Sequence, residues 1–463
     1  ENHPTLPVNR ATAERRLDNT IKKLQQDGLY RAYDDVFQDW LNEGIIEEVP
    51  VDEIEDYGHY LPHRHVIKEN STTRIRPVFD ASSRERSGPS LNQCLETGPN
   101  FIELIPELLL RFRQRKFGVI ADIRRAFLQI SVSKQDRDVM RFLWKRQPGD
   151  KDYVVYRHCR VVFGVSSSPF LLGATIDLHL ENVARDLPQE EVGLVRDLAK
   201  SFYVDNCITS LATIEEMKNF EDKATFYMSR GGFDLRGWEY AGETNPSREA
   251  PVLGLIWDKD KDVMKISSHS LQPKIPSETT KRKILAASQK VFDPIGMVCP
   301  VLLCPKLILQ ALWTTNKGWD ELVDETTSVA FLKWLRDLEN LREVKIPRWA
   351  FGECGDSLSL HLFVDASQVA YAAVIFARVV RCQGIEVRFV QAKSRLAPLG
   401  KPTVPRLELM GVAIGARLLH TTIKTLNRPE LRVYCWTDSS TVLAWIKREN
   451  QWASFVWRRV QEI

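Results

Sequence analysis

The sequence predicts an α+β protein of several domains, and its length, composition and order of patterns lead to this class. The chain has 463 residues, too many for one hydrophobic core, so two to four domains are expected. Its apolar fraction of 43% and charged fraction of 27% are typical of globular protein. Helix and strand patterns are mixed at first, helical in the middle and mixed again at the end, without an internal repeat.

The first half of the chain is predicted to combine helices with short strands. Two charged helical patterns come first, and Gly44 is the expected stop signal of the second. Prolines punctuate the strands that follow. The predicted helices are 11–29, 30–43 and 101–112, and the segment 163–184 is expected to begin with Gly and Ser-Pro and to continue as a helix. The predicted strands are 60–62, 65–67, 75–79 and 117–122.

The second half begins with a predicted hairpin. Residues 201–210 are apolar on both sides of Asp205 and Asn206, and both residue types tolerate turn geometry, so two strands joined by a tight turn are expected. The remaining predicted features are a strand near 252–257, a linker at 271–278, helices after it, a strand-rich region from Leu358 and helices after Arg406.

Composition excludes some functional classes. No apolar run approaches the roughly 18 residues of a membrane-spanning helix. The chain opens at Glu1 without an initiator Met or a signal-peptide pattern, which predicts a segment cut from a longer precursor. The net charge is only +3, so a nucleic-acid partner can be argued only from the basic clusters at 111–116, 281–283 and 458–459. Each cluster alone is more readily explained as a solvated helix face.

Cysteine and histidine spacing does not predict a metal site. The eight Cys are irregularly spaced, so free thiols in a reducing compartment are expected. His59, His63 and His65 stand close together, but no Cys or further His lies beside them at ligand spacing.

Two carboxylates, Asp122 and Asp205, give the first chemical signal, because each is associated with a predicted strand. Nucleotidyl transfer uses two divalent cations about 4 Å apart, and hard cations prefer carboxylate oxygens. Either residue alone is more readily explained as a turn or capping residue. Their joint presence makes a two-metal site a hypothesis.

Five motifs in the same order resemble those of retroelement reverse transcriptases. Residues 119–130 resemble motif A, 163–170 resemble motif B, and 202–206 resemble the Y-x-D-D motif. Residues 252–257 resemble the primer grip, and 74–80 the fingers strand that closes over the nucleotide. Finer patterns resemble BEL/Pao long-terminal-repeat retrotransposon polyproteins over essentially the whole chain; these are 59–63, 88–92, 97–100 and 292–296.

The resemblance implies a right-hand polymerase of fingers, palm and thumb, followed by a helical connection and a ribonuclease H-like α/β domain. The expected boundaries are an N-terminal helical extension at 1–58, fingers and palm at 59–270, thumb and connection at 271–355, and a ribonuclease H-like domain at 356–463. No Asp-Thr-Gly or Asp-Ser-Gly occurs, so no aspartic protease activity is assigned.

The resemblance also implies roles for residues of the polymerase site. Asp122 and Asp205, with the backbone carbonyl of Ile123, would bind two Mg²⁺ ions, or Mn²⁺ in their place. Phe127 stands at the steric-gate position, where a ring under the sugar would exclude a 2′-hydroxyl; its alternative is a plain core aromatic. Tyr203 belongs to the nucleotide-binding set.

Three basic residues and a glycine complete that set. Arg76, with Arg74 or Lys68, would contact the triphosphate, because forked guanidinium donors suit phosphate oxygens. Gly164 would let the backbone approach the nucleotide closely.

One residue departs from the family pattern, because Asn206 stands where a second Asp is expected. A negative charge beside two dications is lost, which is expected to slow the reaction by roughly two decades or more. The resemblance therefore implies a polymerase scaffold whose activity is weakened or lost.

A second set of acids occurs near the end of the chain. Asp365 and Asp438 end predicted strands and Glu408 opens a helix, an order that resembles retroelement ribonuclease H. The family uses a fourth acid beyond a closing helix, which the chain does not reach, and Glu462 is not expected to replace it. The domain is thus expected to be truncated, and a folded but inactive module is an equal alternative.

The function implied is RNA-directed DNA synthesis with an attached ribonuclease H-like module. The implied partners are an RNA template, a DNA primer, an RNA–DNA hybrid and deoxynucleotide triphosphates, without a membrane, in the cytoplasm. Two alternatives stay open: an element-derived nucleic-acid-binding protein with weakened or no catalysis, and a nuclease with a structural polymerase domain.

Overall fold

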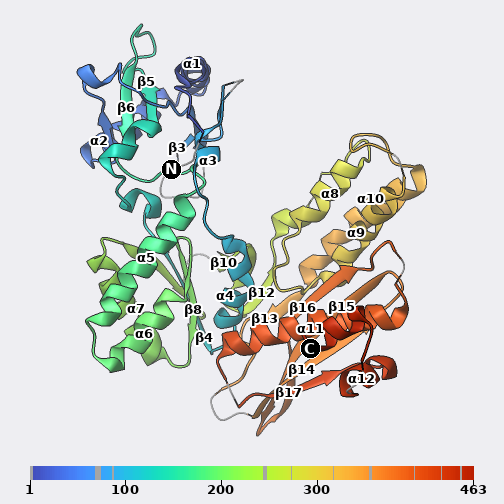
Figure 1. The fold of residues 1–463 in the computed structure, drawn as a ribbon. Coiled ribbons are helices and arrows are strands. Elements are labelled where there is room, and N and C mark those ends of the chain that lie inside the picture. Colours follow the sequence, from blue (N-terminus) through green and yellow to red (C-terminus); the bar gives the residue numbers. More distant parts are fainter. Residues whose placement is uncertain are drawn as a thin grey trace. The chain divides into compact units, whose positions relative to one another are not determined.

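The computed structural model describes two compact units (Figure 1). The described residues are 4–67, 75–85, 88–242, 248–272, 274–315, 317–353, 357–400, 402–428, 430–448 and 451–463. The first unit comprises Glu1–Asn100, Asp122–Asn206 and Lys223–Arg236, and the second comprises Phe101–Ala121, Cys207–Asp222 and Gly237–Ile463.

The first unit begins with two helices, α1 (Arg10–Gln26) and α2 (Tyr30–Asn42). On α2, the buried residues Tyr33, Phe37 and Trp40 follow the i, i+4, i+7 spacing of one helix face. The same spacing on α1 buries Leu17 and Leu24. Both predicted helices are therefore confirmed, and each packs through one apolar face.

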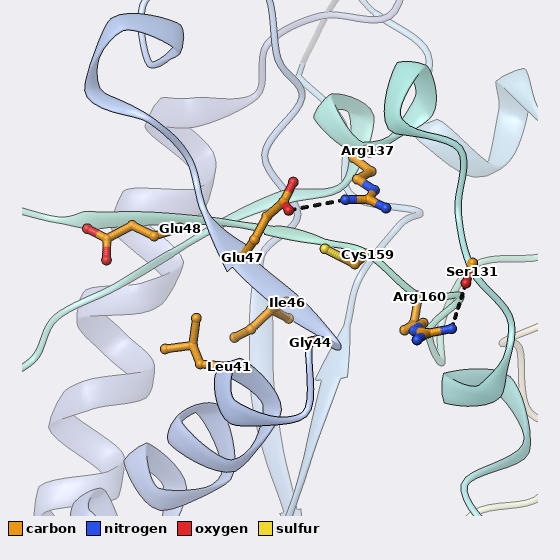
Figure 2. A pocket seen from close by; sticks show the side chains of 9 residues that line it. All are labelled: Leu41, Gly44, Ile46, Glu47, Glu48, Ser131, Arg137, Cys159 and Arg160. Atoms are coloured by element: carbon orange, nitrogen blue, oxygen red, sulfur yellow. Dashed lines mark hydrogen bonds and ion pairs between the residues drawn. The ribbon is translucent and has the colours of Figure 1, made fainter.

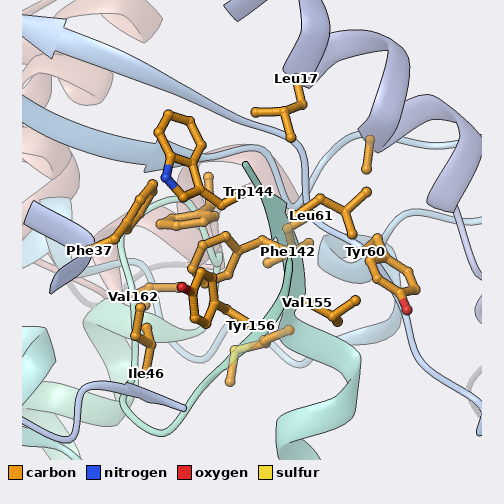
Figure 3. Close-up of a cluster of buried hydrophobic side chains, with 14 of the residues drawn as sticks. Leu17, Phe37, Ile46, Tyr60, Leu61, Phe142, Trp144, Val155, Tyr156 and Val162 are labelled. Atoms are coloured by element: carbon orange, nitrogen blue, oxygen red, sulfur yellow. The ribbon is translucent and has the colours of Figure 1, made fainter. Parts of the chain in front are cut away.

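These helices cover small sheets with which they share one core. The strands β1 (Ile46–Glu48), β6 (Val154–His158) and β5 (Arg141–Trp144) form a sheet in that order, and β2 (His63–Ile67) pairs with β3 (Ile75–Phe79). Figure 3 shows Phe37 of α2 beside Trp144 and Phe142 of β5. Burial of these large side chains is the main stabilising contribution here.

A four-stranded sheet carries the first set of predicted acids, in the order β7-β8-β4-β9. Its strands are β4 (Phe117–Ile123), β7 (Phe202–Tyr203), β8 (Asn206–Leu211) and β9 (Leu235–Tyr240). The chain passes between the two units within β4, β8 and β9. The helices nearby in sequence are α3 (Leu91–Cys94), α5 (Ser168–Arg185), α6 (Gln189–Ala199) and α7 (Ile214–Arg230).

Two local predictions are refined. The strand–turn–strand predicted at 201–210 is confirmed, with Val204 in the turn at a φ of 56°. The segment 163–184, predicted to begin with Gly and Ser-Pro and to continue as a helix, does so, and α5 begins at Ser168. Gly164 has a φ of 101°, which is incompatible with a right-handed helix, so residues before 168 form a loop.

The second unit contains a small sheet and three helices in the region predicted to be helical. The sheet order is β10 (Glu249–Val252), β11 (Leu255–Asp258), β12 (Val263–Ile266) and β13 (Lys345–Pro347). The helices are α8 (Lys281–Lys290), α9 (Cys299–Trp313) and α10 (Glu325–Asp337). The helix predicted at 101–112 is α4 (Ile105–Phe112), preceded by a short 3₁₀ turn.

The last sheet has the order β16-β15-β14-β17 and pairs β14 with β17 in parallel. Its strands are β14 (Ser357–Ala366), β15 (Ala370–Arg381), β16 (Gly384–Leu396) and β17 (Arg432–Trp436). The long helix α11 (Val404–Leu426) packs against β14 and β15 (Figure 1). Gly415 permits this approach, because a Cβ there would lie 2.8 Å from Val364 Cγ1. Two short helices follow, α12 (Ser440–Lys447) and α13 (Ser454–Val460).

Two buried arginines join α4 to the strands of this unit. Arg113 donates from Nη1 to the Val390 carbonyl at 2.7 Å. Arg348 donates to the Phe112 carbonyl at 2.7 Å and forms an ion pair with Asp262 at 2.6 Å. Both arginines are fully buried, and a buried guanidinium is tolerated only when its donors are satisfied. α4 is therefore an integral part of the second unit.

Candidate functional site

The first predicted acids lie at neighbouring positions of the sheet β7-β8-β4-β9. Asp122 is the exposed, second-to-last residue of β4, and Asp205 stands in the turn between β7 and β8. The Ile123 N–H donates to the Asp205 carbonyl at 2.9 Å. This bond aligns the two strand ends, so both carboxylates are carried at the same edge of the sheet.

Asn206 contacts this pair directly. Its amide Nδ2 donates to Asp205 Oδ1 at 2.8 Å. An Asp at position 206 could not donate this bond when ionised, because a carboxylate is only an acceptor. The substitution therefore removes a charge and also engages one oxygen of the neighbouring acid.

Phe127 lies next to the loop that precedes α5. Its side chain is 7% exposed and meets the Phe163 ring edge to face, with 4.7 Å between ring centroids. Phe163 itself is 43% exposed. Both interpretations of Phe127 stay open: the ring is buried, as a core aromatic would be, and its role as the steric gate stays a prediction.

Gly164 makes a close backbone approach. A Cβ added there would lie 2.0 Å from the Phe79 carbonyl oxygen, and its φ of 101° is in the region that favours glycine. The predicted need for glycine thus has a physical cause within the chain, where the loop meets the end of β3. Approach to a nucleotide stays a prediction.

The other residues of the predicted nucleotide-binding set are only partly described. Arg76 lies in β3, paired in register with Val66 of β2. Tyr203 ends β7, and burial raises the pKa of its hydroxyl. Lys68 and Arg74 lie outside the described residues.

The second predicted acids gather at one end of the last sheet. Phe363 of β14 pairs with Trp436 of parallel β17; Asp365 and Asp438 each follow two residues later, so they leave the sheet at the same edge. The α11 residue Glu408 is tied to this edge, because the Ser439 hydroxyl donates to Glu408 Oε2 at 2.5 Å.

Ser439 was not predicted as a site residue, although a signal for it exists in the sequence. It caps α12 by accepting the Val442 N–H at 3.2 Å, and a serine before an apolar helix is the ordinary cap pattern. The cap pattern gives no indication of the additional bond to Glu408. That contact depends on the packing of α11, which is distant in sequence.

No metal-binding group is assembled by either acid set alone. Across the described residues, no three His, Cys, Asp or Glu side chains are gathered closely enough to hold a metal ion. At the first site only two acids stand together, since position 206 is Asn. Their carboxylate oxygens and exposed position still suit a hard cation. At the second site, one oxygen of Glu408 is engaged by Ser439.

The histidines considered at 59, 63 and 65 serve the fold. His63 is buried, with its ring nitrogens bonded to the Tyr33 hydroxyl at 2.8 Å and the Leu143 carbonyl at 2.9 Å. Burial lowers the pKa of His63 to about 4. The His63 ring is thus a hydrogen-bonded core group.

Figure 2 shows a pocket of about 440 Å³ in the first unit. None of the predicted acids lines it. Both of its arginines bond to other lining residues: Arg137 pairs with Glu47 at 3.1 Å, and Arg160 donates to Ser131 Oγ at 2.6 Å. The polar lining is therefore largely self-satisfied and is not assigned a ligand. In the part of the chain that the structure describes, no helix has the length and apolar character to cross a membrane.

Comparison with known proteins gives a family match for one region of the chain and solved structures of similar fold. Residues 280–439 match the family described as the Pao retrotransposon-like RNaseH-like domain. No curated protein matches the sequence.

Solved structures of foamy viral protease-reverse transcriptase are similar in fold. One, a dRH form in complex with double-stranded DNA, has a TM-score of 0.57 at 15% identity and covers 93% of this chain and 67% of that one. A complex with an RNA/DNA hybrid has a TM-score of 0.56 at 15% identity over 93% of this chain, which spans 51% of that protein. A further double-stranded DNA complex has a TM-score of 0.55 at 16% identity over 92% and 79% of the two chains. The predicted BEL/Pao resemblance and the predicted α+β fold class are confirmed.

Proposed function

We propose that this chain, which is of the Pao retrotransposon type and has the reverse transcriptase fold, is an RNA-directed DNA polymerase weakened by Asn206. The observation that carries the proposal is the alignment of Asp122 and Asp205 by the bond from the Ile123 N–H to the Asp205 carbonyl, at 2.9 Å. Two acids at one exposed sheet edge can share divalent cations.

The proposed roles follow from this edge. Asp122 and Asp205, with the Ile123 carbonyl, would hold Mg²⁺ or Mn²⁺, which would activate the attacking hydroxyl and balance the triphosphate charge. Phe127 would exclude the 2′-hydroxyl, while Gly164 and Tyr203 would line the nucleotide site. Arg76, with Arg74 or Lys68, would bind the triphosphate. The partners would be an RNA template, a DNA primer and deoxynucleotides, in the cytoplasm.

For the second acids we propose a ribonuclease H-like site that binds an RNA–DNA hybrid. The common sheet edge of Asp365 and Asp438, with Glu408 beside it, supports this site for Mg²⁺. Cleavage is not assigned, because Ser439 engages Glu408 and the described residues hold no group of three metal ligands. We also propose the boundaries 1–58, 59–270, 271–355 and 356–463 as functional domains.

Primer extension on an RNA template tests the polymerase proposal. We expect slow extension by the unchanged chain with Mg²⁺ or Mn²⁺, and a rate higher by about two decades in Asn206→Asp, because that variant restores a charge beside the metals and removes the amide donor. Asp205→Ala is expected to abolish extension.

A matched control adds the same charge elsewhere. Asn182 is exposed on α5, and Asn182→Asp should leave the rate unchanged. If Asn206→Asp also fails to extend any primer while the protein binds the hybrid, polymerase activity is excluded.

That last outcome would favour a second candidate function, an element-derived nucleic-acid-binding protein without catalysis. The specific observation in its favour is the bond from Asn206 Nδ2 to Asp205 Oδ1 at 2.8 Å, which engages an oxygen that a cation would need. Hybrid binding that is equal with and without divalent cations would support this second candidate.

A further inference from the structure

The segment 88–92 resembles the retroelement family in sequence, yet no role in the site follows from that resemblance. In the structure this segment forms a turn and the start of the short helix α3. Its Asn92 lies beside two other segments: the residues that follow β3, and the loop between Phe163 and Ser168. All three segments belong to the first unit.

Asn92 bonds to the loop with both ends of its side-chain amide. Oδ1 accepts the Ser166 N–H at 2.8 Å, and Nδ2 donates to the Gly164 carbonyl at 3.1 Å. These two partners also fix the amide's orientation, since one is a donor and the other an acceptor. The pair of bonds therefore sets the spacing of residues 164 and 166.

Asn92 is itself anchored to the chain that leaves β3. Its N–H donates to the Ala81 carbonyl at 3.0 Å, and Nδ2 donates to Ser82 Oγ at 2.9 Å. The residue thus ties the loop to the strand that carries Arg76. Close contact between the same two segments occurs at Gly164, which lies against the Phe79 carbonyl.

The loop that Asn92 holds begins at Phe163, which contacts Phe127, the residue expected to be the steric gate. Phe163 directly precedes Gly164 and meets the Phe127 ring at 4.7 Å between centroids. At the loop's other end, the Ser168 hydroxyl donates to the Val162 carbonyl at 2.8 Å. The direction of Phe163, and with it the room available to Phe127, depends on this loop and on the bonds that hold it.

We propose that Asn92 is a positioning residue for sugar selection: by clamping Gly164 and Ser166, it holds Phe163 against Phe127 and so keeps the space below the sugar too small for a 2′-hydroxyl. This inference rests on the proposed polymerase function. Asn92 acts only through the loop and does not touch the nucleotide. The amide is required, since neither an apolar side chain nor a carboxylate provides both a donor and an acceptor.

The test measures nucleotide binding, so it does not depend on the rate of catalysis. The full chain is bound to an RNA template with a dideoxy-terminated DNA primer in Mg²⁺ or Mn²⁺. Affinity is read as the stabilisation of this complex by the matched deoxynucleotide or ribonucleotide. For Asn92→Ala we expect the preference for deoxynucleotide to fall about five- to tenfold, the size of one or two lost hydrogen bonds, with deoxynucleotide affinity changed less than about twofold.

A neighbouring residue provides the matched control. Gln93 is in the same short helix, and its side chain accepts the Ser90 N–H at 2.9 Å. Gln93→Ala therefore disturbs α3 without removing the bonds of Asn92 to the loop, and should keep the sugar preference. Asn92→Asp is nearly the same size and keeps only an acceptor, so it carries the test if Asn92→Ala does not fold.

The outcomes separate this inference from the function on which it rests. Unchanged sugar preference in both Asn92 variants overturns the positioning role. Equal weakening of both nucleotides overturns it as well, because that is the result of a purely structural residue. If the unchanged chain and Asn206→Asp show no complex stabilised by deoxynucleotide, the proposed polymerase function fails and this inference with it.

Discussion

His158 lies at the centre of the first unit between aromatic side chains. Its ring centroid is 4.4 Å from that of Phe79 and 4.9 Å from that of Phe142. The ring is fully buried, and neither nitrogen has a hydrogen-bond partner among the described residues. Burial, and then the neighbouring His63, lower the pKa of His158 to about 3. Only the neutral imidazole suits this position.

Stability is therefore expected to depend on pH. Folded His158 and His63 stay neutral down to pKa values of about 3 and about 4, whereas the unfolded chain protonates them near their ordinary value of about 6.5. The unfolded state binds more protons, so the free energy of unfolding falls as pH decreases from about 6.5 toward 4, by up to about 1.4 kcal/mol per pH unit for each residue.

Denaturant unfolding between pH 7 and pH 4.5 measures this dependence. In His158→Phe the slope of the unfolding free energy against pH should be smaller by the contribution of one histidine. His63 should account for part of the slope that is left. At pH 8 the variant should be at least as stable, since a ring of similar shape replaces a polar group without partners. Parallel stability curves for variant and parent would show that His158 does not titrate on unfolding.

Sequence reasoning succeeded at this scale where a motif combines residue type with local order. Asp122, Asp205, Asp365 and Asp438 stand at strand ends or turns as expected. Asn92 and Ser439 were missed because their partners are distant in sequence, 72 residues away for Gly164 and 31 for Glu408. Local patterns predict caps and turns, whereas such contacts appear only after the elements have packed.

At the scale of elements, α4 depends on partners far along the chain. Arg348 donates to the carbonyls of Phe112 and Arg115 near the end of this helix, at 2.7 and 2.9 Å, and pairs with Asp262. Arg113 in turn donates from Nε to the Arg348 carbonyl at 3.3 Å. Burial, and then Arg348, lower the pKa of Arg113 to about 9, so it stays charged at neutral pH.

Arg348→Met should destabilise the second unit by about 3 to 5 kcal/mol, because the carbonyls of Phe112 and Arg115 lose a buried donor and Asp262 loses its ion-pair partner. Guanidinium unfolding, followed by near-ultraviolet circular dichroism, measures the change. Arg282→Met is the control: Arg282 pairs with Asp320 at 2.7 Å on the surface, and its loss should leave the midpoint almost unchanged. Equal effects of the two substitutions would contradict a structural role for Arg348.

The start of α5 shows which part of an element boundary is local. The Ser168-Pro169 pair suits the first turn of a helix, and α5 begins there as predicted. Gly164 has a positive φ, and a Cβ there would lie 2.0 Å from the Phe79 carbonyl oxygen, so this position requires glycine. That contact comes from β3, which is about 85 residues earlier in the chain, so no local signal contains it.

At the scale of the whole molecule, each unit is built from several segments that alternate along the chain. Residues 101–121 and 207–222 belong to the second unit although segments of the first unit flank them. Leu110 of α4 is part of the same buried cluster as Leu360, Ile375 and Leu407 of the ribonuclease H-like sheet and its helix. The predicted boundaries, which group residues 101–112 with the fingers and palm, stay a prediction. Motif order follows the chain and contains no signal of such an exchange.

A chain that ends at residue 355 tests this organisation. It keeps every residue of the first unit but removes β14 to β17 and the Val390 carbonyl that Arg113 needs. We expect trypsin to cleave rapidly at Arg111, Arg113 or Lys116, while the core around Phe142 stays protected, because local opening follows lost burial. Mass spectrometry of timed digests measures this.

A chain that ends at residue 448 is the control, since it retains these partners of α4. Its sites at 111–116 should resist cleavage. Equal protection of these sites in the chain ending at 355 would show that α4 folds independently of the ribonuclease H-like sheet.

The separation in sequence between Arg113 and its acceptor also determines when this hydrogen bond can form during synthesis. Arg113 and Val390 are separated by 277 residues. At about 5 to 20 residues per second, a ribosome needs roughly 14 to 55 seconds to make the chain between them. Throughout that interval Arg113 has been synthesised while its acceptor, the Val390 carbonyl, has not. In the nascent chain α4 is therefore without this bond at first. A chaperone that covers α4 would act during translation, before any nucleic acid is bound.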